Sequence, residues 1–128
     1  MNLPRLALIL LLFSLSSIAS AQSLDTCTEQ EIAHLFTFIK GSPCRFYRNG
    51  EWHSSMEAAE HIDKKYRYVL KRNLIHDTDD FIRYTATQSF LSGKRYQVEC
   101  PDAEPMESQQ WLHDELDRYR AEQKLNSD

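Results

Sequence analysis

The stretch Cys44-Arg-Phe-Tyr-Arg-Asn-Gly-Glu-Trp-His53 decides how this chain of 128 residues folds. Its first half alternates and is rich in aromatic side chains, which is typical of a β-strand. Asn49-Gly50 is the strongest signal for a two-residue hairpin turn, because Asn and Gly tolerate the positive φ angles that such a turn requires. Glu51-Trp52-His53 then supplies a short return strand. The sequence therefore predicts a β-hairpin over residues 44–53.

Helical patterns lie on both sides of this hairpin. Thr28-x-x-Glu31 is a capping-box pattern, and apolar residues follow it at helical spacing as far as Gly41. Ser54-x-x-Glu57 is a second capping box, which opens a helix to about residue 72. Acidic residues at 77–80 begin a third helix, and a last helix follows residue 105 and frays after about residue 123. The residues that we expect on the buried faces of these helices are Ile32, Leu35, Phe36, Ile39, Met56, Ala59, Ile62, Tyr66, Val69, Phe81, Ile82, Trp111, Leu112, Leu116 and Tyr119.

One later strand completes the predicted sheet. Arg95-Tyr-Gln-Val-Glu-Cys100 alternates after a turn at Ser92-Gly93. The order helix, strand pair, two helices, strand, helix predicts an α+β fold, in which a small antiparallel sheet packs with about four helices. No repeat or long linker divides residues 22–128, which we expect to form a single domain.

Residues 1–21 have the pattern of a secretory signal peptide. Arg5 precedes the apolar run Leu6–Phe13, and Ala19-Ser20-Ala21 is a small-x-small motif that a signal peptidase accepts. An uncleaved membrane anchor is one alternative, but the run is shorter than the roughly 20 apolar residues that span a bilayer. A lipoprotein modified at Cys27 is the other, but Asp25 stands where a lipobox needs a small, uncharged residue. We expect cleavage after Ala21, which would leave residues 22–128 with no membrane span.

The composition argues against several classes of protein. A formal net charge of -4 argues against a nucleic-acid binder, for which a basic surface is expected. The aromatic content of 11% suits a folded domain rather than a disordered chain. The basic run at 64–72 follows acidic residues on the same predicted helix, as the helix dipole favours. We therefore interpret that run as a solvated helix face rather than as a site for nucleic acid or anionic lipid.

All three cysteines follow the signal peptide, so we expect them in an oxidising compartment. Cys44 and Cys100 both end strand-like runs, whereas Cys27 precedes a helix, which favours a Cys44–Cys100 disulfide. We interpret the remaining Cys27 as a buried or masked thiol, with an intermolecular bridge as the alternative. The expected state is a monomer, and a Cys27-linked dimer is the alternative.

The five histidines and the serines form no known catalytic or metal-binding motif. His61 lies one helical turn after Glu57, and His53 just precedes that helix, but zinc needs three or four converging ligands. We interpret Glu57 and His61 as a surface pair. No catalytic residue, metal ligand or cofactor is assigned. A small hydrolase or a metal-binding or ligand-binding enzyme that uses His53, His61 and Ser92 is kept as an alternative.

The hairpin carries the clearest signal for binding. Trp, Tyr and Arg are the residue types most enriched at binding hot spots, and they cluster here near the turn. Alternate residues such as Phe46 would instead belong to the core. The candidate binding surface consists of Arg45, Tyr47, Arg48, Asn49, Trp52, His53 and His61.

Several motifs from the hairpin onward match a known pattern: Cys44-Arg-Phe-Tyr-Arg-Asn-Gly50, Trp52-His53, Ala58-Ala59-x-His61-Ile62-x-x-Lys65, Asp80-Phe81-Ile82, Ser92-Gly93, Tyr96-Gln-Val98 and Trp111-Leu112. On these residues the sequence resembles the YfeK-like family of small exported bacterial proteins. The similarity continues past the helix after the hairpin but departs at Ser89-Phe90, where the family usually has two serines, and at Lys94-Arg95. Cys44 and Cys100 fall within the shared pattern and Cys27 outside it, which further favours the predicted disulfide.

The resemblance implies a periplasmic protein of a bacterium with two membranes, and it implies no activity. Because the chain has no recognisable catalytic motif, our leading hypothesis is a non-enzymatic domain. It would bind another component of the cell envelope, either a protein or a glycan, through the hairpin.

Overall fold

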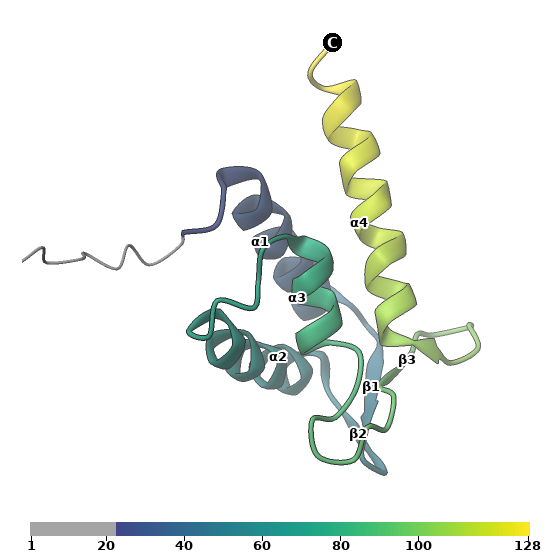
Figure 1. Ribbon diagram of the computed structural model, residues 1–128. Helices are drawn as coiled ribbons and strands as arrows, with labels where there is room; N and C mark the ends of the chain where they lie inside the picture. The colour runs from purple at the N-terminus through teal and green to yellow at the C-terminus, as the bar shows by residue number, and fades with distance from the viewer. Residues whose placement is uncertain (1–22) are drawn as a thin grey trace, which may run out of the picture.

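The computed structural model describes residues 23–128 and has the predicted α+β fold (Figure 1). The predicted signal peptide, residues 1–21, lies outside the described residues. In chain order the elements are α1 (Thr26–Gly41), β1 (Arg45–Arg48), β2 (Glu51–His53), α2 (Ser55–Leu70), α3 (Thr78–Thr85), β3 (Gln97–Glu99), β4 (Met106–Glu107) and α4 (Ser108–Leu125).

The sheet has the strand order β2-β1-β3-β4, and every neighbouring pair is antiparallel. The predicted hairpin is confirmed, and both residues of its turn have positive φ, 49° at Asn49 and 88° at Gly50. The sequence prediction missed β4, because a strand of two residues is too short to show alternation. Opposite residues share a face, so Phe46 points to the same side of the sheet as Val98.

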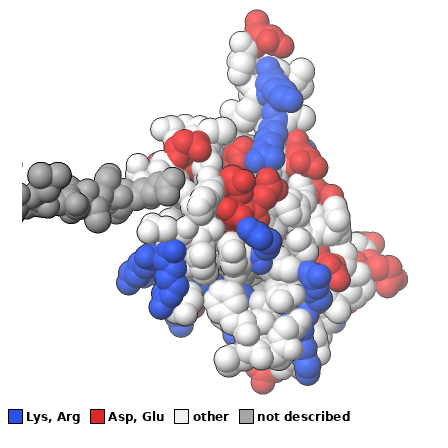
Figure 2. All heavy atoms as spheres, viewed as in Figure 1, with Lys and Arg blue, Asp and Glu red and all other residues white. Residues whose placement is uncertain are grey.

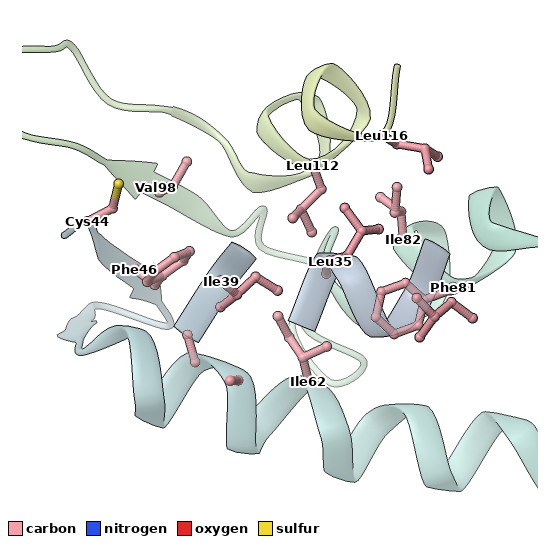
Figure 3. Packing of buried hydrophobic residues seen from close by; sticks show 14 of the residues in the cluster. Leu35, Ile39, Cys44, Phe46, Ile62, Phe81, Ile82, Val98, Leu112 and Leu116 are labelled. Carbon is pink, nitrogen blue, oxygen red and sulfur yellow. The ribbon is translucent and has the colours of Figure 1, made fainter. Parts of the chain in front are cut away.

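The core lies between this inner face of the sheet and the helices. Leu35 and Ile39 of α1 are completely buried, as are Phe81 and Ile82 of α3. Figure 3 shows Phe46 of β1 beside Ile39, with side chains of α2 and α4 closing the cluster from either side. Most of the predicted core residues are confirmed. Met56 was wrongly placed in the core: it is 52% exposed, because it lies in the first turn of α2.

Of the three helix starts predicted from capping boxes or acidic residues, two are confirmed. Ser54 caps α2 by accepting a hydrogen bond from the Glu57 N–H at 3.2 Å, and Asp77 caps α3. The predicted cap at Thr28 is wrong, because α1 begins earlier and Asp25 accepts a bond from the Thr28 N–H at 2.9 Å. Thr28 instead lies buried within the helix.

Glu31, which the capping-box interpretation placed at a helix end, joins three helices. Its buried carboxylate accepts two hydrogen bonds from the Arg120 guanidinium of α4, at 2.8 and 2.9 Å. It also accepts a bond from the Thr78 hydroxyl at the start of α3. These bonds hold the pKa of Glu31 below its usual value, Arg120 having the largest effect. Through these bonds Glu31 of α1 holds both α4 and the start of α3 in place.

The last helix is longer than predicted and continues to Leu125. Figure 1 shows the C-terminal turns of α4 extending beyond the other helices. Within residues 23–128, no helix combines the length and the apolarity that a bilayer crossing requires.

The predicted disulfide between Cys44 and Cys100 is present and joins the beginning of β1 to the end of β3 within one chain. The interpretation of Cys27 as a buried thiol is wrong. Cys27 is free and exposed in the first turn of α1, with its sulfur 3.8 Å from a carboxylate oxygen of Glu31. That carboxylate has the largest effect in raising the pKa of the Cys27 thiol.

Candidate functional site

The structure divides the predicted binding residues between the two faces of the sheet. In the hairpin, Tyr47 pairs with Trp52 and Arg48 pairs with Glu51. Because side chains alternate along a strand, Arg45, Tyr47 and Trp52 lie on the outer face, whereas Arg48 and His53 lie on the face toward the helices. The seven residues therefore do not form one surface.

Arg45, Tyr47 and Trp52 form what we call the outer-face cluster. The Arg45 guanidinium lies 4.1 Å from the centroid of the Trp52 ring, and Tyr47 meets that ring edge-on at 5.3 Å. Arg45 also donates from Nε to a carboxylate oxygen of Glu99 on β3, at 2.8 Å. Trp52 remains 38% exposed. These contacts hold two large aromatic rings and a guanidinium in a fixed arrangement that reaches solvent.

Arg48, His53 and His61 meet on the other side, where they line a small cavity of about 30 Å³. The walls of this cavity are mostly apolar and come from the sheet and from α1, α2 and α4. Ser108 also lines it, and its buried hydroxyl has no hydrogen-bond partner among residues 23–128. His53 is bound to Glu57 at 2.9 Å, so the predicted surface pair of Glu57 with His61 is wrong.

His61 belongs to a hydrogen-bonded chain that the sequence did not predict. Its ring nitrogen lies 3.2 Å from the Tyr96 hydroxyl, and the Lys65 ammonium donates to the same hydroxyl at 3.1 Å. Lys65 also donates to the backbone carbonyl of Gln88 at 2.7 Å. Lys65 is only 6% exposed, which corrects the interpretation of residues 64–72 as a uniformly solvated face.

The hydrogen-bonded residues His61, Tyr96 and Lys65 include no carboxylate. Their burial and the positive charges near them shift the pKa values of His61 and Lys65. Burial is the main cause that lowers the pKa of His61 to about 4, and the charges of Arg48 and Lys65 lower it further. Burial also lowers the pKa of Lys65 to about 8, with a smaller effect from Arg48. His61 is therefore neutral at pH 7, and the Tyr96 hydroxyl can donate to it while accepting from Lys65.

Asn49 and Ser92 join the hairpin turn to the loop before β3. The Ser92 hydroxyl donates to the Asn49 side-chain oxygen at 2.9 Å, and the Asn49 amide donates to the Ser89 hydroxyl at 3.4 Å. Ser92 is thus bound to the turn and not to His53 or His61. The structure does not assemble these three residues into a nucleophile–base pair, whose members should lie within hydrogen-bond reach.

The remaining histidines lie elsewhere and pair with carboxylates. His34 is 2.7 Å from Glu115, and His113 is 3.4 Å from Asp79. His76, which precedes α3, lies 3.7 Å from Asp80 in the first turn of that helix. Within the described part of the chain, no group of three or more His, Cys, Asp or Glu side chains is arranged to hold a metal ion.

Comparison with known proteins places the chain in a family. A family model described as a family of unknown function, DUF5329, matches residues 26–120. The chain belongs to the DUF5329 family. The match includes every residue of the outer-face cluster and of the His61–Tyr96–Lys65 chain. No curated protein and no solved structure gave a significant match.

Sequence reasoning missed Lys65 and Tyr96. Lys65 belongs to a basic run that suggested a solvent-facing helix, and Tyr96 was interpreted only as part of a strand. One signal was available: Lys65 follows His61 at i+4, so that both side chains lie on the same stripe of α2. That this stripe faces Gln88 and Tyr96, which precede β3, could not be read from the spacing.

Proposed function

We propose that this member of the DUF5329 family is a periplasmic, non-enzymatic domain that binds a protein of the cell envelope through the outer-face cluster. Export is supported by the signal-peptide pattern of residues 1–21 and by the resemblance to the YfeK-like family. Binding is supported by one observation above all. Arg45, Tyr47 and Trp52 contact one another on the exposed face of a sheet whose other face is the core.

This cluster suits a protein partner for two physical reasons. Trp, Tyr and Arg contribute most to protein interfaces, and here the three side chains are ordered before binding, which reduces the entropy lost on association. A glycan would need an open aromatic ring face on which a sugar could stack. One face of Trp52 is already covered by Arg45.

The alternative of a small hydrolase or metal-binding enzyme has less support. His53 is bound to Glu57, His61 to Tyr96 and Ser92 to Asn49, so the three proposed groups have separate partners. The positively charged surroundings of His61 also disfavour the protonated form that a general acid needs.

The test is capture of envelope proteins by the immobilised protein and by a double variant, Tyr47→Ala with Trp52→Ala. We expect the double variant to lose its partner while its melting temperature changes little, because both side chains lie on the solvent side of the sheet. Met56→Ala, which removes another large exposed side chain, is the matched control and should retain the partner.

A further variant in the same experiment distinguishes binding through the outer face of the sheet from binding through its inner face. Arg48→Ala alters the inner side and should leave the capture intact. Loss of the partner in Arg48→Ala but not in the double variant would contradict the proposal. Retention of the protein on isolated peptidoglycan through Tyr47 and Trp52 would also contradict it, because the partner would then be a glycan.

A further inference from the structure

The loop of residues 88–95, between α3 and β3, presents apolar side chains to solvent. Phe90 is 54% exposed and Leu91 is fully exposed. The loop is nevertheless ordered by Ser89. The Ser89 backbone bonds to Gly93 and Lys94 at 3.0 Å each, and its hydroxyl accepts from the N–H groups of Leu91 and Ser92 at 3.3 Å. The apolar tip is therefore held outward by the loop's own hydrogen bonds.

The exposed apolar surface continues from this tip onto α2. Tyr68, which is half-exposed, lies with its ring centroid 6.0 Å from that of Phe90. The Arg72 guanidinium stacks 3.5 Å from the centroid of the Tyr68 ring, and the Lys65 ammonium lies 4.1 Å from that of Phe90. Cations thus lie directly against the aromatic rings.

Further cations surround this surface. Lys64 lies one turn before Tyr68 on α2, Lys71 directly follows the end of that helix, and Lys94 and Arg95 belong to the loop itself. Among the described residues, none of these cations is in an ion pair with a carboxylate, whereas Arg67, Arg83, Arg118 and Arg120 all are. Figure 2 shows Lys and Arg on both sides of an uncharged area in the lower part of the molecule. A protein of net charge -4 therefore carries a local surface of the opposite sign.

We propose that this basic-apolar patch docks on a membrane surface that contains anionic phospholipids. The patch consists of Tyr68, Phe90 and Leu91, surrounded by Lys64, Lys71, Arg72, Lys94 and Arg95. Three of these cations belong to the basic run of residues 64–72, so the proposal departs from the interpretation of that run, from sequence, as a solvated helix face. Leu91 and Phe90 would enter the headgroup region, and the cations would contact lipid phosphates.

Charge complementarity favours a membrane over a protein as the occupant. Surface-bound proteins combine a small inserted apolar group with several Lys and Arg, and each cation near an anionic surface strengthens binding separately. A protein interface would instead be depleted in lysine, and this patch contains three exposed lysines. The patch shares no residue with the outer-face cluster, so docking would place the domain at a membrane independently of its protein partner.

The test is cosedimentation of the purified protein with two kinds of vesicle, phosphatidylcholine alone and phosphatidylcholine with an equal part of phosphatidylglycerol. Mass spectrometry first establishes that the preparation begins at Gln22, because an uncleaved apolar segment would itself enter a bilayer. We expect binding to the anionic vesicles only. Phe90→Ser with Leu91→Ser should weaken it at least tenfold, and Lys64→Gln with Lys71→Gln roughly fivefold for each cation removed.

Matched controls come from the far end of α4. Leu125→Ser removes a leucine that is 80% exposed, and Lys124→Gln removes an exposed lysine. Both should bind like the unchanged protein. Failure to bind the phosphatidylglycerol vesicles would overturn the proposal. It would also be overturned if the protein bound both kinds of vesicle equally and the variant with Phe90→Ser and Leu91→Ser still bound them. A protein, rather than lipid, crosslinked through position 91 in intact cells would overturn it as well.

Discussion

His61 lies where a proton would add one more positive charge to a partly buried group of cations. Arg48 and Lys65 both act on its ring, and the residues that contact it directly offer no carboxylate. The neutral ring suits the Tyr96 hydroxyl, which can donate to it only while the ring nitrogen is unprotonated. The protein is therefore expected to resist protonation at this residue.

This resistance makes stability depend on pH. The unfolded chain protonates His61 near its usual pKa of 6.5, whereas the folded protein does so only near 4. Between these two pH values the unfolded state binds more protons than the folded state. The contribution of His61 to the free energy of unfolding should therefore be fully present above pH 6.5 and be lost as the pH falls toward 4. After allowance for solvent screening, we expect a loss of roughly 2 kcal/mol from this group.

Urea unfolding at neutral and acidic pH measures the effect. His61→Gln should show a smaller loss of stability than the unchanged protein over the same range, whereas His76→Gln, on an exposed ring, should not differ from it. An NMR titration in which the folded protein protonates His61 near 6.5 would contradict this account.

For single residues, the sequence indicated which side chains were candidates better than it indicated their hydrogen-bond partners. Tyr47 and Trp52 could be selected as candidates because hot-spot residue types gather at one turn, and His61 because it lies one helical turn after Glu57. Lys65 could not, because a lysine in a basic run gives no sign that its ammonium will bond to a tyrosine 31 residues later. The spacing also suggested that Glu57 would pair with His61, but the hairpin brings His53 to that carboxylate instead.

At the scale of elements, the hairpin turn fixes the register of β1 against β2 and so decides which side chains reach the outer face. Gly50 has a φ of 88°, which a residue with a Cβ adopts only with strain. Gly50→Ala should therefore lower the free energy of unfolding by roughly 1 to 2 kcal/mol.

Gly41→Ala is the matched control for the turn variant. Gly41 ends α1 without a positive φ, and an added Cβ would meet no heavy atom within 4 Å. The stability of the Gly41→Ala variant should stay the same or rise slightly, because alanine lowers the conformational entropy of the unfolded chain. If urea denaturation shows equal losses at both positions, the positive φ is not what makes Gly50 necessary.

The disulfide ties the start of β1 to the end of β3 across 56 residues. In the chain-entropy model, closing a loop of this length stabilises the fold by about 4 kcal/mol. Cys44→Ser with Cys100→Ser should lose about that much in urea unfolding under non-reducing conditions, whereas Cys27→Ser should lose little. A double variant as stable as the unchanged protein would show that the disulfide adds nothing to stability.

The element pattern was the most predictable part of the molecule. Helical spacing with acidic or hydroxyl residues at the start revealed α1 to α3, spacing alone revealed α4, and the Asn-Gly turn revealed the hairpin. Capping boxes alone were ambiguous: Ser54 is a cap, whereas Thr28 is buried because Asp25 precedes it and can start the helix earlier. β4 exists only because β3 is there to pair with it, which no local pattern shows.

For the whole molecule, two proposals depend on export. We expect the protein isolated from the periplasm to have the mass of residues 22–128 minus two hydrogens, because the signal peptide is removed and one disulfide forms. An unreduced mass spectrum measures both at once. Retention of residues 1–21 would contradict export by cleavage, and a dimer that disappears on reduction would assign Cys27 an intermolecular bridge.

The central claim is that the outer-face cluster binds an envelope protein, and photo-crosslinking in intact cells tests it most directly. A photoreactive amino acid at Gln97, which is exposed on β3 opposite Tyr47, leaves Arg45, Tyr47 and Trp52 intact. We predict a discrete protein adduct from position 97, none from exposed position 110 on α4, and loss of the adduct when Tyr47→Ala and Trp52→Ala are added. No adduct at position 97, or an adduct that survives both substitutions, would contradict the claim.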